Sequence, residues 1–171
     1  MRGHSTTSVP ARRQCTPDER HVWLTHQRAS NPETGEWLLV RYREQPLLGL
    51  ATLTGAPEIA GMTSFFRRPH EDSGAMKRFT IREALKHFED QAQAGNSDGL
   101  ARLHKIRRFV GQAGQPGSAP IVTLVVFVDD AVVVDGNHTA MAAYLRALEG
   151  SLAAGLPVFV LETGHPSSVL A

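Results

Sequence analysis

The side chains best suited to chemistry lie together in one short turn, DGNHT, at residues 135–139. Four apolar residues, 131–134, lead into this turn, and a helix-forming segment follows it directly. Where a strand ends at a glycine and a helix begins, the unpaired N–H groups of the first helical turn and the positive end of the helix dipole face whatever lies above the strand. Because this arrangement favours an anion, the pattern predicts an active or binding site for an anionic ligand.

Each residue of the turn also has an ordinary structural interpretation. Asp135 and Gly136 form a common turn pair, Asn137 is a typical N-cap, and Thr139 is a frequent residue at a helix start. His138 is the strongest functional candidate, because a helix N-terminus disfavours a protonated imidazole and capping does not require one. We interpret Gly136, Asn137 and Thr139 as ligand-binding, with the structural alternative left open.

A basic helix face could assist this turn. The segment 97–111 has an apolar stripe on one side and carries Lys105, Arg107 and Arg108 on the other. One interpretation is a solvated helix face. The other is that one or two of these side chains clamp an anionic ligand near the glycine turn.

The apolar patterns indicate which elements position these residues. A capping box, Thr80 with Glu83 three residues later, begins a helix over 80–94, and further helices are expected over 97–111 and from Thr139 towards Gly150. The expected strands are 36–43, 46–54, 121–128, 131–134 and 156–162. The first two should pair antiparallel, and the next two should form a hairpin. The stretch 55–74 is expected to be a lid or a mobile insertion.

These elements predict the α/β class, with a small mixed sheet flanked by helices. A single domain over 21–165 is expected, with a flexible arm at 1–20 and a tail at 166–171. The net charge of +1 gives no reason to expect nucleic acid or an anionic membrane as a partner. No apolar run approaches the roughly 18 residues that a membrane span needs. The sole cysteine, Cys15, has no internal disulfide partner, and we expect a cytoplasmic protein.

The stretch 106–162 resembles the ParB and sulfiredoxin superfamily, with its best match over 100–162. The matching features are the strand–turn–helix VVVDGNH, an Ala142-Ala143 pair in the helix and the strand LPVFVLE. Family members usually carry a D-G-x-H-R signature at this turn. Thr139 stands where the family has arginine, which removes a bidentate phosphate ligand. The sulfiredoxin subgroup places a reactive cysteine in the turn, where this chain has Asn137, so sulfiredoxin chemistry is not expected. Nor is specific DNA binding expected, because the chain ends soon after the last strand.

The resemblance is greatest to stand-alone members that use a nucleotide to phosphorylate a small hydroxylated molecule. It implies ATP or ADP with Mg²⁺ as cofactor, phosphate held at the turn, His138 as a donor to it, and Asp135 as a metal ligand or as the residue that orients His138. Glu58 or Glu83 would be the general base. A non-catalytic ligand-binding or regulatory module is one alternative. A biosynthetic enzyme of different chemistry on the same fold is another.

Overall fold

The computed structural model describes residues 9–30, 32–69, 74–113 and 121–170. Within these ranges seven strands join in one mixed sheet, in the order β1-β2-β7-β5-β6-β3-β4. Their bounds are β1 Arg13–Gln14, β2 Leu48–Leu53, β3 Thr63–Pro69, β4 Met76–Thr80, β5 Val122–Val126, β6 Ala131–Asp135 and β7 Leu156–Glu162. Strand β5 pairs parallel with β7 and antiparallel with β6. The α/β class, the mixed sheet and the second predicted hairpin are therefore confirmed.

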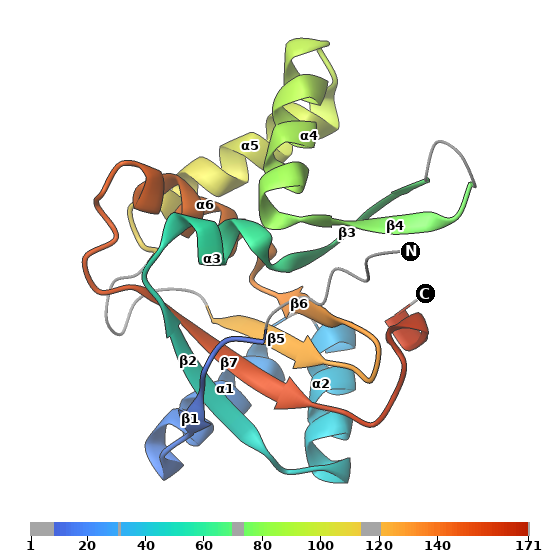
Figure 1. Cartoon of the computed structure of the whole chain (residues 1–171), viewed down its shortest axis with the longest axis vertical. Coiled ribbons are helices and arrows are strands. Elements are labelled where there is room, and N and C mark those ends of the chain that lie inside the picture. Colours follow the sequence, from blue (N-terminus) through green and yellow to red (C-terminus); the bar gives the residue numbers. More distant parts are fainter. Residues whose placement is uncertain (1–8, 31, 70–73, 114–120, 171) are drawn as a thin grey trace, which may run out of the picture.

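Helices cover both faces of this sheet (Figure 1). The helices α1 Pro17–Ala29 and α2 Pro32–Glu44 pack on one face, and α3 Ala56–Gly61, α4 Ile81–Gln93 and α6 Asn137–Leu148 lie on the other, where α5 Ser97–Val110 packs on α4 and α6. Because side chains alternate along a strand, each central strand supplies both cores. Val133 of β6 lies in the core beneath α3 to α6, whereas Val132 and Val134 lie in the core beneath α1 and α2.

Local capping explains where three helices begin. The hydroxyl of Thr80 accepts a hydrogen bond from the Glu83 N–H, and the Glu83 carboxylate accepts one from the Thr80 N–H, so the predicted capping box of α4 is confirmed. Thr16 and Glu19 form the same arrangement at the start of α1. The side chain of Asn96 caps α5. None of the helices in the described ranges is both long and apolar enough to span a bilayer.

The segment 36–43, expected to be a strand, lies within α2 instead. Pro32 is tolerated in the first helical turn, and Leu38 is fully buried against the sheet. The helix also packs very closely on α1, since a Cβ at Gly35 would lie 2.0 Å from the carbonyl oxygen of Gln27. Tertiary packing therefore overrides the β-forming composition of this segment. As a consequence, β2 pairs with β1 and β7 rather than with residues 36–43.

Three boundaries also differ from expectation. Residues 55–69 form α3 and β3 rather than a lid or an insertion, while 70–73 lie outside the described residues. Within the expected arm, Arg13–Gln14 pairs with β2 and Cys15 is buried, and residues 1–8 of the arm lie outside the described part of the chain. The expected tail contains a 3-10 turn, η1 Ser167–Leu170.

Candidate functional site

The DGNHT turn is the predicted strand-to-helix junction, and Gly136 is the N-cap of α6. Gly136 has a φ of +80°, and a Cβ at this position would lie 2.4 Å from the carbonyl oxygen of Ile121. Both the left-handed backbone and the close approach of β5 require glycine here. Gly136 therefore has a structural duty whatever else the turn does.

Two of the predicted ligand-binding residues are turned into the protein. Asn137 is 8% exposed; its side-chain oxygen Oδ1 accepts a hydrogen bond from the Phe65 N–H at 3.0 Å, and its side-chain Nδ2 donates to the Val133 carbonyl at 2.9 Å. Thr139 is 1% exposed. The side chain of Asn137 thus links α6 to β3 and β6, and that of Thr139 is enclosed in the protein, which accounts for both without a ligand.

Asp135 and His138 are not partners of each other. Asp135 lies at the end of β6, and its carboxylate contacts Nε2 of His26 from α1 at 3.0 Å. The hydroxyl of Ser30, at the end of α1, lies 3.0 Å from the same ring nitrogen. Asp135 is therefore engaged on the α1 side of the sheet, and the hypothesis that it orients His138 is wrong.

His138 lies on the opposite side, among aromatic and basic residues. Its ring packs edge-on to Phe66, with 5.7 Å between ring centroids, and its Nε2 atom is buried with no hydrogen-bond partner among the described residues. Burial, followed by the nearby charges of Lys105 and Arg102, lowers the pKa of His138 to about 4. At neutral pH the imidazole is therefore uncharged and contributes no positive charge to anion binding.

The basic face of α5 divides into two parts. Arg102 lies over the rings of Phe66 and Phe88, at 4.9 and 5.2 Å from their centroids, and forms an ion pair with Asp98. Lys105 is exposed but close enough to affect the titration of His138. Arg107 and Arg108 are exposed on the last turns of α5. The structure thus brings Lys105 near His138 and leaves Arg107 and Arg108 on a solvated face.

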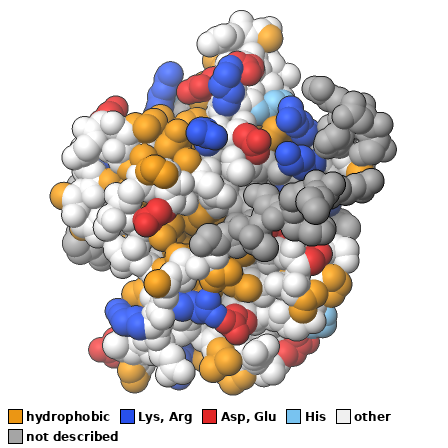
Figure 2. Space-filling model, in the orientation of Figure 1, with side chains coloured by type: hydrophobic (Ala, Val, Ile, Leu, Met, Phe, Trp, Pro, Cys, Tyr) orange, Lys and Arg blue, Asp and Glu red, His pale blue; other side chains and the backbone are white. Residues whose placement is uncertain are grey.

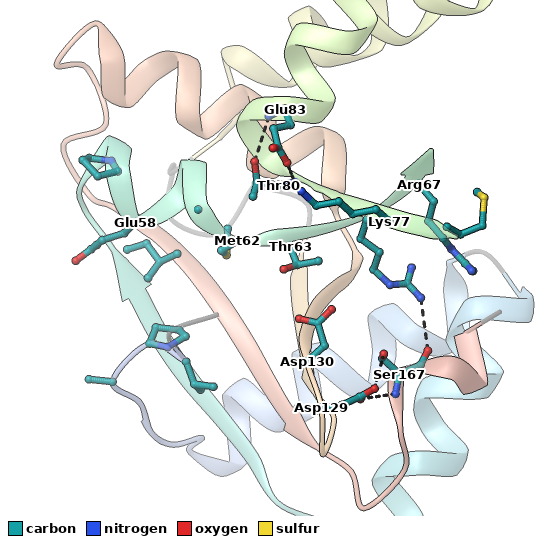
Figure 3. A pocket seen from close by; sticks show the side chains of 18 of the residues that line it. Glu58, Met62, Thr63, Arg67, Lys77, Thr80, Glu83, Asp129, Asp130 and Ser167 are labelled. Carbon is teal, nitrogen blue, oxygen red and sulfur yellow. Dashed lines mark hydrogen bonds between the residues drawn. The ribbon is translucent and has the colours of Figure 1, made fainter. Parts of the chain in front are cut away.

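The main cavity lies elsewhere, and it contains two of the predicted residues. Its volume is about 1100 Å³, and it is lined by parts of β2, α3, β3, β4 and the start of α4, together with residues 9–11, the β5–β6 turn and η1. Glu58 of α3 and Glu83 of α4 line it. Figure 3 shows Arg67 and Lys77 on the hairpin side, facing Asp130 and Ser167 across the cavity. Residues 135–139 are not part of this lining.

Three cations from the β3–β4 hairpin line the cavity, namely Arg67, Lys77 and Arg78. In the strand register, Arg67 lies directly opposite Arg78, and the adjacent pair, Arg68 and Lys77, is also basic. Figure 2 shows Lys and Arg side chains gathered over this hairpin. Burial and then the charge of Arg67 lower the pKa of Arg78. Like charges opposite each other weaken a strand pair, and the nearby carboxylates of Asp129 and Asp130 offset part of this repulsion at Arg78.

The carboxylates of the cavity have structural roles as well. Glu83 caps α4, and the hydrogen bond from the Thr80 backbone is the main cause that lowers the pKa of its side chain. Glu58 accepts from the N–H groups of Thr54 and Gly55 at 3.3 and 3.4 Å, which positions it at the start of α3. Glu83 is accordingly ionised at neutral pH and suited to attracting a cation rather than a proton.

A divalent ion bound in this cavity would take some of its ligands from a bound substrate. Among the described residues, no three His, Cys, Asp or Glu side chains are grouped as a preformed metal site. Mg²⁺ commonly takes only one or two protein carboxylates and completes its shell with water and substrate phosphates. A single cavity carboxylate such as Glu83 fits that pattern, whereas Asp135, the residue expected to hold a metal, is engaged with His26.

Sequence reasoning missed the three hairpin cations. Arg67 and Arg78 are 11 positions apart, and their opposition depends on the β3–β4 register. The available signal was the basic pair Arg67-Arg68 following two phenylalanines, in a stretch expected to be a loop.

Comparison of the chain with protein-family models, with curated proteins and with solved structures finds no match.

Proposed function

We propose that the protein binds a phosphorylated small molecule in the cavity beside the β3–β4 hairpin and that it is a nucleotide-dependent phosphotransferase acting on a small hydroxylated molecule. The observation that carries this proposal is the placement of Arg67 opposite Arg78 at a cavity large enough for a nucleotide. The ParB-like interpretation of residues 100–162 belongs to the same proposal, with the ligand moved from the DGNHT turn to this cavity.

Two guanidinium groups side by side suit a polyphosphate. Each offers a planar fork of N–H donors that matches phosphate oxygens, and charge-assisted bonds of this kind are about twice as strong as neutral ones. The repulsion between Arg67 and Arg78 would be offset by a bound anion, so part of the binding free energy comes from relief of an unfavourable contact. Lys77, exposed at the cavity rim, supplies a third charge.

Phosphoryl transfer needs positioning and charge stabilisation more than an unusual nucleophile. The acceptor hydroxyl oxygen would bond to the γ-phosphorus of ATP as the bond from that phosphorus to the bridging oxygen breaks, and ADP would leave. The hydroxyl proton would pass to a carboxylate, for which the exposed Glu58 is better suited than Glu83 with its lowered pKa. Glu83 would instead help to hold Mg²⁺ beside the phosphates.

A non-catalytic binding module is the second candidate, and one observation favours it. Both cavity glutamates are already hydrogen-bonded to backbone N–H groups at helix starts, Glu58 in α3 and Glu83 in α4. A carboxylate fixed in that way would serve structure and leave ligand binding to the arginines. This version has the same ligand class but no turnover.

Calorimetric titration with MgATP and MgADP, with Arg78→Ala and Arg107→Ala, tests the site. We expect the parent and Arg107→Ala to bind alike, and Arg78→Ala to lose at least about tenfold in affinity, because a charge-assisted hydrogen bond contributes about 1.5–3 kcal/mol. Equal unfolding midpoints in urea would show that the variants are folded. Loss of affinity in Arg107→Ala but not in Arg78→Ala would place the ligand at α5 and contradict the proposal, as would no binding by the parent.

The same titration samples separate the two candidates by turnover. ADP formation with a panel of small hydroxylated acceptors identifies the phosphotransferase, and it should fall in Glu58→Gln, in which the amide accepts no proton. Binding without ADP formation for any acceptor would favour the non-catalytic module.

A further inference from the structure

The chain beyond β7 runs past the end of β5 and reaches the cavity. The N–H of Thr163 donates to the Val126 carbonyl at 3.0 Å, and the N–H of Val128 donates to the His165 carbonyl at 3.2 Å, so this segment runs beside the end of β5. The His165 ring is held by Arg41 of α2, at 2.7 Å from Nε2. The segment is therefore anchored up to His165, and residues 166–170 extend from that anchor.

This extension, which we call the C-terminal strap (residues 166–170), contacts the same arginines that face the cavity. Arg67 donates to the Leu170 carbonyl, and Arg78 donates to the Ser167 carbonyl at 3.5 Å. Ser167 lines the cavity itself. The carbonyl groups of the strap thus occupy positions near the guanidinium groups where phosphate oxygens would bind.

A carboxylate also holds the strap at this position. The side chain of Asp129, in the β5–β6 turn, accepts from the Ser167 N–H at 2.6 Å and from the Ser167 hydroxyl at 3.1 Å (Figure 3). Packing contributes less, since every residue of η1 is at least partly exposed and Val169 is 43% exposed, although Leu170 touches the core beneath α1 and α2. The two hydrogen bonds to Asp129 are exposed and those to Arg67 and Arg78 are partly buried. A segment with so little buried packing opens at low free-energy cost.

We infer that the C-terminal strap competes with the anionic ligand for Arg67 and Arg78, so that the ligand binds when the strap is released; this inference rests on the proposed function. Hydrogen-bond strength decides which of the two, ligand or strap, displaces the other. A neutral carbonyl is a weaker acceptor for a guanidinium than a charged phosphate oxygen. The ligand therefore displaces the strap. The contact between Asp129 and Ser167 favours the bound strap and so lowers the apparent affinity for the ligand.

The variant Ser167→Pro weakens the attachment of the strap without changing the charge of the cavity. Proline removes the N–H and the hydroxyl that bind Asp129, while every charged residue stays in place. We expect the affinity for MgATP to rise by about threefold to tenfold, because a larger fraction of the protein is then competent to bind. Ser168→Ala is the control: Ser168 also lines the cavity, and its replacement leaves the Asp129 contacts intact. An unchanged or lower affinity in Ser167→Pro would overturn the inference.

Hydrogen exchange at the Ser167 amide tests the same inference in the unaltered protein. Saturating MgATP should speed exchange at this amide, since release of the strap breaks its bond to Asp129. Slower exchange would show that the strap closes over the ligand, which contradicts competition. These results are distinguishable from failure of the proposed function: if the parent binds MgATP and Arg78→Ala does not, the site stands even where Ser167→Pro has no effect. If neither the parent nor Ser167→Pro binds, both the site and the strap inference are wrong.

Discussion

Protonation of His138 should destabilise the protein as the pH falls below neutrality. Burial is the main cause that lowers the pKa of its imidazole from 6.5 to about 4, with the charges of Lys105 and Arg102 adding to it. Between these two values the unfolded chain binds the proton and the folded protein does not, so stability rises with pH. The stabilising contribution is fully present above pH 6.5 and is lost as the pH falls through this window towards 4.

The size of this effect follows from the shift. Between pH 7 and pH 4.5, a group with these two pKa values contributes about 2.5 kcal/mol to the pH dependence of the free energy of unfolding. Solvent screening of the partly exposed ring reduces this to about 1.5 kcal/mol. Urea unfolding of the parent and of His138→Leu at the two pH values measures it. The parent should lose about 1.5 kcal/mol more than the variant.

Thr139→Ala is the matched control for this experiment. Thr139 lies in the same helical turn, is 1% exposed and carries no titrating group. Its replacement should lower the free energy of unfolding by the same amount at both pH values. If His138→Leu loses as much stability on acidification as the parent, the folded protein does not hold this imidazole uncharged, and the reasoning from burial is refuted.

Two further predictions concern the turn, and urea unfolding midpoints check both. Gly136→Ala should cost about 3 kcal/mol, against about 1 kcal/mol for Gly150→Ala, because both glycines have a positive φ but only the first meets a backbone carbonyl, that of Ile121; equal costs would contradict the close contact. Asn137→Ala should cost about 2–3 kcal/mol because it breaks two hydrogen bonds of a buried side chain. The exposed N-cap variant Asn96→Ala should cost about 1 kcal/mol; a cost for Asn137→Ala no larger than this would show that its hydrogen bonds add little.

The parts of the fold that sequence predicted are those set by neighbours in the chain. The capping box of Thr80 and Glu83 satisfies backbone donors within one helical turn, and the β5–β6 hairpin joins two apolar runs across a short turn. The strand-to-helix junction at Gly136 likewise follows from adjacent residues. In each case the physical cause lies within a few positions of the pattern that reveals it.

The parts that sequence did not predict depend on distant partners. The side chain of Asn137 bonds to the backbone of Phe65, 72 positions earlier, so its link to β3 had no local signal. Residues 36–43 have a β-forming composition, yet they belong to the helix α2, which packs on α1 and buries Leu38. The opposition of Arg67 and Arg78 likewise appears only once the β3–β4 register is known.

The attachment of β3 to the rest of the sheet depends in part on the DGNHT turn. Strand β3 pairs with β6 through only two residue pairs, Thr63 with Val132 and Ser64 with Val133, and Asn137 then continues the link by bonding to the Phe65 N–H. The β3–β4 hairpin is thus joined to the rest of the sheet by a short strand pairing, which the hydrogen bond from Phe65 to Asn137 extends. Flexing at this pairing would change the spacing between the hairpin arginines and the opposite cavity wall. Asn137 would then influence ligand binding indirectly, through the position of the β3–β4 hairpin, without touching the bound molecule.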